Sequence, residues 1–361
     1  MKLILKQMTL LIGAMLALYG VALALSLLLV PRAQIGQRLD AGLATQSLYM
    51  TEPKYVFLAR GQLNNTHDKL LLVGASNMQA GFRQAQMQAQ LPQAEVHNLA
   101  VGGSNITQVG QIIDLVREVQ SPEARRHNTF VIGLWYGLFA DDKARWYTDD
   151  RHAGDTDIDI ERYRYGFYRR TAQGPAPVLP PEHLEWGVVL IHPYLVLDRT
   201  ARDLTRSLRS YIAAKPKVIT DEQRNATVLS EADKKKYLAF WHTYMGAAQT
   251  LGDAPFLVLE RAVEQILADG GRVVLVDMPI PAWHAKGAAL QADYLRRITP
   301  LLDRLQARPG VTVVPAFDSD DDDFSDEVHP KPRVTNLWAQ RLASAVTAGP
   351  MPAAAQSASM R

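Results

Sequence analysis

The stretch KLLLVGASN, residues 69–77, decides the fold. Its first five residues are apolar apart from the lysine, which is typical of a strand buried on both faces of a sheet. Gly74 and Ala75 then interrupt the apolar run, and a helical pattern begins near Asn77. A buried strand that turns sharply into a helix is the opening unit of a parallel sheet covered by helices.

The same rhythm recurs along the chain. Four further short apolar runs predict strands, and four amphipathic stretches predict the helices between and after them. We therefore expect an α/β domain built on a flavodoxin-like open parallel sheet of five strands. The further predicted strands are 95–100, 129–134, 272–277 and 311–314, and the predicted helices are 106–119, 255–268, 289–307 and 333–346.

Between about residues 139 and 252 the rhythm is broken by a segment rich in Arg, Tyr, Pro and Asp, which we interpret as an insertion. It contains WGVVLIHPYLVL at 186–197, which is too short to span a bilayer. This run predicts either a buried strand pair or core segment, or a surface that leans on a membrane or a membrane partner. The next segment is expected to be helical, and one face of it carries Arg202, Arg206 and Arg209. This basic face is either solvated or a contact for anionic lipid or polymer.

Composition excludes several classes of protein. The 361 residues suit one large core with an elaboration rather than three domains. Lys and Arg number 39 against 37 Asp and Glu, so the net charge of +2 provides no field for recruiting nucleic acid. The chain has no cysteine, which excludes a disulfide framework, a thiolate metal site and a cysteine nucleophile.

Residues 8–30 are uncharged and almost wholly apolar, and Lys2 and Lys6 precede them. A bilayer core of about 30 Å needs about 20 helical residues, and positive charge at the N-terminal flank favours the N-in orientation. We predict a single-pass anchor at 1–32 in a bacterial inner membrane, with the rest of the chain in the periplasm or outside. The alternative is a cleaved signal peptide, because Ala22-Leu-Ala24 resembles a cleavage site.

The remaining domain boundaries follow from composition. We expect a stalk or lead-in at 33–68, the principal domain with its insertion at 69–348, and a disordered tail of small and polar residues at 349–361.

Reactive residues fall where the predicted strands end. In an open parallel sheet the site lies beyond the carboxyl ends of the strands. Ser76 follows the first predicted strand, so its hydroxyl is a candidate nucleophile, or it simply caps the next helix. Gly102 and Gly103 follow the second strand. Their backbone can approach a ligand closely, which makes Gly103 a candidate oxyanion donor, or they form only a tight turn.

A base and its orienting group follow the fifth predicted strand in the sequence DEVHP. An aspartate three residues before a histidine can accept the imidazole Nδ1–H and leave Nε2 to take the proton of a serine. Asp326 and His329 are therefore candidate partners of Ser76, since a histidine titrates near neutral pH.

These segments, in this order, resemble the SGNH (GDSL-like) hydrolase superfamily over residues 69–346, the insertion excluded. GASN resembles the family's first block, with Ser76 at the nucleophile and Ala75 in place of the usual Asp. NLAVGG and DEVHP resemble two further blocks, and the resemblance assigns Gly103 to the oxyanion hole and the Asp and His roles to Asp326 and His329.

This chain departs from the family's pattern in the third block. GLWY at 133–136 stands where the family has an oxyanion Asn. The resemblance therefore implies an oxyanion hole made of the N–H groups of Ser76 and Gly103, with Asn77 and Tyr136 as further candidates. A missing donor typically costs about 2.7–4 kcal/mol of transition-state stabilisation, which favours a specialised acyl transfer over simple hydrolysis.

An anchor, an SGNH-like core and a large insertion together resemble proteins that work beside membrane-bound O-acyltransferases, such as alginate and cellulose acetylation proteins and the D-alanine transfer protein of teichoic-acid modification. The resemblance implies that Ser76 takes an acyl group, most simply acetyl, and passes it to a polysaccharide hydroxyl without a cofactor. An SGNH esterase or deacetylase and a non-catalytic scaffold of a polysaccharide export system are the alternatives.

The acidic run at 318–323 contains the D-x-D-x-D spacing of calcium loops. It has Asp323 where the turn needs Gly and His329 where a closing Glu would stand, so we expect no metal site. We expect a solvated acidic loop whose charge raises the pKa of His329. The other histidines, including His192 and His242, lack metal-binding companions and are expected to be structural or exposed.

Overall fold

The computed structural model describes residues 2–29, 56, 60–140, 157–164, 166–212, 219–245 and 250–348. Most of the predicted stalk and the whole predicted tail lie outside these residues.

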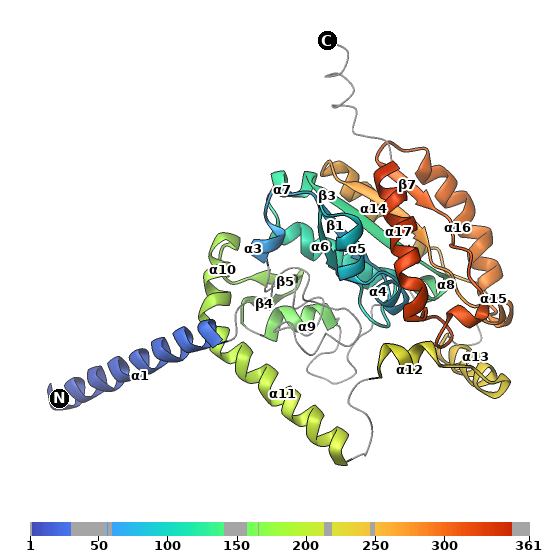
Figure 1. Ribbon diagram of the computed structural model, residues 1–361. Coiled ribbons are helices and arrows are strands. Elements are labelled where there is room, and N and C mark those ends of the chain that lie inside the picture. The colour runs from blue at the N-terminus through green and yellow to red at the C-terminus, as the bar shows by residue number, and fades with distance from the viewer. Residues whose placement is uncertain are drawn as a thin grey trace, which may run out of the picture.

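A five-stranded parallel sheet forms the centre of the molecule (Figure 1). Its order is β2-β1-β3-β6-β7, so the strands that come first and second along the chain exchange places at one edge. This is the order of doubly wound, flavodoxin-like sheets. The prediction of an α/β fold with a five-stranded parallel sheet is confirmed. The strands are β1 (Lys69–Val73), β2 (Glu95–Asn98), β3 (Asn128–Leu134), β6 (Arg272–Asp277) and β7 (Val311–Val314).

Helices cover the sheet in two groups. In Figure 1, α4 (Ser76–Gly81), α5 (Gln84–Gln90) and α17 (Pro332–Ala348) lie in front of the sheet, and α17 packs on both α4 and α5. In the second group, α6 (Ile106–Val119) packs on α14 (Ala254–Ala268). The other helices of the core are α3 (Arg60–Leu63), α7 (Pro122–Arg126), α8 (Tyr136–Phe139), α15 (Ala282–Gly287), α16 (Gln291–Gln306) and the 3₁₀ turn Asp321–Asp323.

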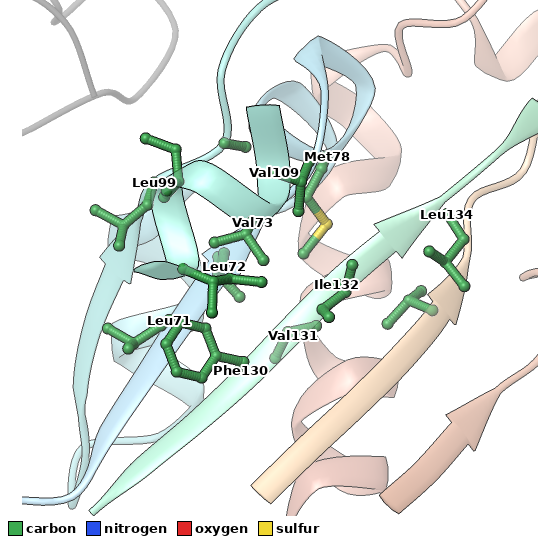
Figure 2. Close-up of a cluster of buried hydrophobic side chains, with 14 of the residues drawn as sticks. Leu71, Leu72, Val73, Met78, Leu99, Val109, Phe130, Val131, Ile132 and Leu134 are labelled. Carbon is green, nitrogen blue, oxygen red and sulfur yellow. The ribbon is translucent and has the colours of Figure 1, made fainter. Parts of the chain in front are cut away.

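The central strands are buried along their whole length. Every residue of β1 and of β3 is buried, because helices cover both faces, and this explains why both strands read as continuous apolar runs. Figure 2 shows the core around these strands, with Leu72, Ile132, Met78 and Val109 among its members.

The insertion contributes its own elements. A short hairpin of β4 (Tyr168–Thr171) and β5 (Gly174–Pro177) follows α9 (Asp157–Arg164). Four helices come after it: α10 (Pro181–Leu190), α11 (His192–Ile212), α12 (Asp221–Asn225) and α13 (Glu231–Met245).

The prediction of a strand pair at 186–197 is wrong, because this segment is helical in α10 and α11. Pro193 is the second residue of α11, where a proline is tolerated because the first turn needs no backbone N–H donor. The segment is part core and part surface: Val188 and Leu195 are buried, whereas Trp186 and Leu197 are exposed.

The N-terminal helix α1 (Lys2–Leu29) is long and apolar enough to cross a membrane. None of its residues is buried, so it is no core helix. It projects from the domain and touches it where α10 meets α11 (Figure 1).

Candidate active site

The turn after β1 presents Ser76. Gly74 has φ 151°, and a Cβ on it would lie 2.9 Å from Cβ of Met78, so this position requires glycine. The N-cap of α4 is Ala75, and no side chain caps the helix there. Ser76 is therefore the first residue of the helix rather than its cap, and it is partly exposed. The alternative prediction, that Ser76 caps the N-terminus of this helix, is therefore wrong.

The loop between β2 and α6 lies against this turn. Val101 N–H donates to Gly74 O at 2.9 Å, and the Ser104 hydroxyl donates to the same oxygen at 3.1 Å. A Cβ on Gly102 would lie 3.9 Å from Cβ of Ser76, so the two loops are in contact beside the serine. Gly103 has φ 68°, a left-handed conformation that favours glycine. The two loops predicted to form the nucleophile turn and the oxyanion segment thus meet.

After β7 the chain brings Asp326 and His329 together. The Nδ1 atom of His329 lies 2.7 Å from Oδ2 and 2.9 Å from Oδ1 of Asp326. Oδ1 also accepts the backbone N–H groups of Val328 at 3.0 Å and of His329 at 2.8 Å. The carboxylate is therefore fixed by the turn that it closes, and it orients the ring so that Nε2 is the nitrogen that can take a proton.

The charges of this pair are set by burial and by each other. Burial disfavours the imidazolium, but the hydrogen bond and charge of Asp326, with the charge of Glu327, outweigh it and raise the pKa of His329 above its usual value. Burial likewise opposes the charge of Asp326, but its bond to His329 holds the pKa of that carboxyl below its usual value. The pair thus favours an ionised carboxylate beside an imidazole that is more basic than usual.

The helix that begins with Ser76, α4, packs on the helix that follows His329, α17, which begins at Pro332. Both residues follow strands at the carboxyl edge of the parallel sheet. Among the described residues no hydrogen bond joins the Ser76 hydroxyl to His329. Catalytic hydrogen bonds are often long in free enzymes and tighten when the substrate binds.

The two further oxyanion candidates differ in their contacts. The hydroxyl of Tyr136 is buried and lies 2.7 Å from Nε2 of His284, whose Nδ1 lies 2.6 Å from the backbone oxygen of Glu327. Tyr136 thus supports the segment that carries Asp326. Asn77 is buried beside Ser76, and its Nδ2 has no hydrogen-bond partner in the described part of the chain. A buried amide without a partner is costly, so Asn77 is the stronger candidate donor of the two.

The insertion reaches this site, which the sequence did not predict. On α13, Trp241 Nε1 donates to Glu327 Oε1 at 3.3 Å. Burial and the charges of Glu327 and Asp326 raise the pKa of Tyr237, and the charge of Arg224 on α12 opposes protonation of His329. No spacing in the sequence links these residues to the DEVHP segment, because only tertiary packing brings them together.

A cluster of aromatic rings lies beside the segment that carries Asp326 and His329. The ring of Trp135 lies 5.3 Å from that of Trp241 and 5.1 Å from that of Tyr136, both edge to face. Trp283 stacks on His284 at 5.5 Å. These contacts join α8, α13 and α15, so the insertion and the core share one aromatic cluster.

The acidic run is exposed, as predicted, but its carboxylates have partners. Asp322 binds Lys331 and Arg333, each at 2.8 Å, and Asp321 accepts the N–H of Ala282 at 2.6 Å. The acidic run therefore stabilises the segment that follows His329, through the ion pairs of Asp322 with Lys331 and Arg333. The groups that raise the pKa of His329 are Asp326 and Glu327, so the prediction that the acidic run does so is wrong.

One of the other histidines has a structural role, as expected. His192 is buried and its Nδ1 lies 2.9 Å from the Ser26 hydroxyl, which is a structural role. Within the described ranges no three acidic, histidine or cysteine side chains form a metal-binding group.

The sequence matches no known family model, and no curated protein matches it.

Proposed function

We propose that the protein is an SGNH-type serine acyltransferase that carries an acyl group, most simply acetyl, to a hydroxyl of an exported or cell-surface polysaccharide. The observation that carries this proposal is the Asp326–His329 pair, joined at 2.7 Å at the sheet edge where the Ser76 turn lies. This is the arrangement that a serine nucleophile requires of its base and orienting group.

The steps follow from the positions of these groups. His329 Nε2 takes the proton of Ser76 as Oγ attacks the carbonyl of an acyl donor, and Asp326 stabilises the imidazolium that forms. The N–H groups of Ser76 and Gly103 and the free amide of Asn77 stabilise the oxyanion. The leaving group departs with the proton from His329. An acceptor hydroxyl then attacks the acyl-enzyme while His329 takes its proton. As this second intermediate collapses, the bond from the acyl carbon to Ser76 Oγ breaks, His329 returns the proton to Oγ, and the acylated acceptor is released.

Two features support a polysaccharide acceptor and transfer rather than hydrolysis. Trp241 and Trp283 are only partly buried, and indole rings are of the kind on which sugar rings stack. The insertion helices α12 and α13 border the pair, and a bound acceptor in contact with them would exclude water from the acyl-enzyme.

A membrane location fits the same proposal. The apolar helix α1, with Lys2 and Lys6 at its N-terminal end, would cross a bacterial inner membrane with the domain outside the cytoplasm. A membrane-bound O-acyltransferase would then supply the acyl group from the cytoplasmic side. This partner is suggested by the resemblance to SGNH-like acetylation proteins.

The first test is intact-mass analysis of the full-length protein in detergent after incubation with p-nitrophenyl acetate. We expect an acetyl adduct, or turnover, that disappears in Ser76→Ala and in His329→Gln. Ser344→Ala is the matched control, because this exposed serine on α17 bonds only to the backbone of its own helix.

Three outcomes separate the functions. Transfer of the acetyl group to an added oligosaccharide in preference to water supports the transferase, and release of acetate alone supports an esterase or deacetylase. A folded wild-type protein that is neither acetylated nor active contradicts both enzymes and leaves the scaffold of an export system.

A further inference from the structure

Helices α10 and α11 meet at an elbow, which we define as residues 181–212. One side of the elbow is docked on the domain. Val188 and Leu195 are buried, and Gly187 lies so close to Phe167 that an added Cβ would be 2.6 Å from the ring. Ile191 N–H donates to Gly187 O at 3.1 Å and so carries the backbone hydrogen bonding through the joint. The elbow is therefore a fixed part of the insertion.

The other side of the elbow is apolar and exposed. Trp186 is 71% exposed, Leu197 is 68% exposed and Tyr211 is 85% exposed. On α11 the exposed apolar side chains recur at helical spacing, so they share one face of the helix. Monomeric soluble proteins rarely expose so many large apolar side chains together. The set comprises Trp186, Leu190, Tyr194, Leu197, Leu204, Leu208, Tyr211 and Ile212.

The elbow contacts α1 within the apolar part of that helix. The hydroxyl of Tyr19 donates to the backbone oxygen of Leu190, and Ser26 lies 2.9 Å from Nδ1 of the buried His192. Tyr19 precedes Leu29 by ten residues, which is about 15 Å at the rise of an α-helix. The elbow thus lies beside the last turns of α1 and not beyond its end, and α11 then runs away from α1 (Figure 1).

We propose that the elbow is a second membrane attachment, immersed in the outer part of the bilayer that α1 crosses, with α11 lying along the membrane surface. The inference rests on the proposed anchoring by α1. A bilayer that surrounds α1 as far as Leu29 also reaches Leu190, because Leu190 is hydrogen-bonded to Tyr19, which lies ten residues before the end of α1. The twelve uncharged residues 186–197 are too short to span, which suits entry into one leaflet.

Lipid is the occupant that the chemistry favours. The elbow is helical on both sides of Ile191, so its backbone groups bond internally as an apolar medium requires. The α11 sequence carries four arginines and two aspartates, and its exposed Arg209 would lie near anionic headgroups. Trp186 and Tyr194 are of the type enriched where bilayers meet water.

The chain has no cysteine, so single cysteines can carry a spin label anywhere. The full-length protein is reconstituted into vesicles of phosphatidylethanolamine and phosphatidylglycerol. For each label, its collisions with oxygen, which partitions into lipid, are compared with its collisions with a water-soluble nickel chelate. Leu197→Cys and Leu208→Cys probe the apolar face, and Arg209→Cys is the matched control on the same helix. Leu16→Cys in α1 is the lipid reference, and Gln173→Cys at the tip of the β4–β5 turn is the aqueous reference.

We expect the oxygen-to-nickel ratio at Leu197 and Leu208 to approach that at Leu16 and to exceed that at Arg209 and Gln173 several-fold. Water-like values at both apolar positions, with a lipid value at Leu16, would overturn the proposal while leaving the anchor intact. Protection from both reagents would identify a protein contact, such as a second copy, and would also overturn it. A water-like value at Leu16 would reject the anchor and the elbow together, without bearing on the chemistry of Ser76.

Discussion

At the scale of single residues, the site is governed by how Asp326 holds His329. In the proposed mechanism the ring acts as base only when it is neutral, and its raised pKa means that the rate should rise with pH through a value above the usual pKa of histidine. Replacing Asp326 by Asn should lower activity by about 10³- to 10⁴-fold, because the ring loses the acceptor that selects its tautomer. The rising limb of the pH profile should also move to lower pH, because the charge that raised the pKa of His329 is gone.

Acetyl-ester turnover measured from pH 5 to 9 tests this prediction. The exposed Asp303→Asn on α16 is the control, and its profile should match the wild type. An Asp326→Asn protein with full activity would show that the pair has no catalytic role.

Asp277 is a second carboxyl with an unusual environment. It ends β6 and lines a cleft of about 550 Å³ with Met278 and Phe317. Burial raises its pKa to about 6, compared with about 3.9 for an unfolded aspartate. The protonated form therefore favours folding below about pH 4, and that contribution is lost as pH rises through 6.

Asp277→Asn should remove this dependence. The variant should be more stable than the wild type at pH 7.5, by a free energy of unfolding on the order of 2 kcal/mol, and about equally stable near pH 4. Urea unfolding in detergent, followed by tryptophan fluorescence at both pH values, measures the difference. An equal difference at the two pH values would contradict the assignment.

At the scale of elements, the turn between β1 and α4 depends on Gly74. Its φ of 151° and the 2.9 Å approach of a Cβ to Met78 leave no room for a side chain. Gly74→Ala should cost about 1–3 kcal/mol of unfolding free energy and should also shift Ser76. Gly102→Ala is the control, because its Cβ would have only one contact, at 3.9 Å, and the position has no positive φ. Chemical unfolding of the two variants should separate them, and equal stabilities would contradict the argument.

The elements also show what the sequence can reveal. The strands at 272–277 and 311–314 and the helix at 106–119 have the predicted bounds, since each has a strong apolar pattern. The helical structure of residues 186–197, within the elbow, was not predicted. Its buried and exposed faces are both apolar at 186–197, so the sequence shows no alternation of polar and apolar residues from which a helix could be read.

Only part of the candidate site could likewise be found from the sequence. Ser76, Gly103, Asp326 and His329 could be selected from the sequence because each follows a strand, and parallel strands bring their carboxyl ends to one edge. Arg224, Tyr237 and Trp241 could not, because they reach the site from an insertion whose packing no local spacing encodes.

At the scale of the whole molecule, the elbow and α1 would hold the domain at two points. A single helix leaves a domain free to swing, whereas two attachments fix its height and tilt above the membrane. The same elbow packs on the domain through buried Val188 and Leu195, so the insertion would link the bilayer to the site that its other helices border.

The strand order has a consequence for how the protein matures. Ser76 follows β1, the first strand of the sheet along the chain, whereas His329 follows β7, the last, and β1 lies between β2 and β3 in the sheet. Contacts between segments so distant in sequence form late, because closing long loops is entropically costly. If the domain crosses the membrane in sequence order behind α1, as the proposed location implies, His329 would reach Ser76 only when almost the whole domain had crossed. A nascent or truncated chain would therefore carry the proposed nucleophile without its proposed base, and the proposed activity would be confined to complete chains.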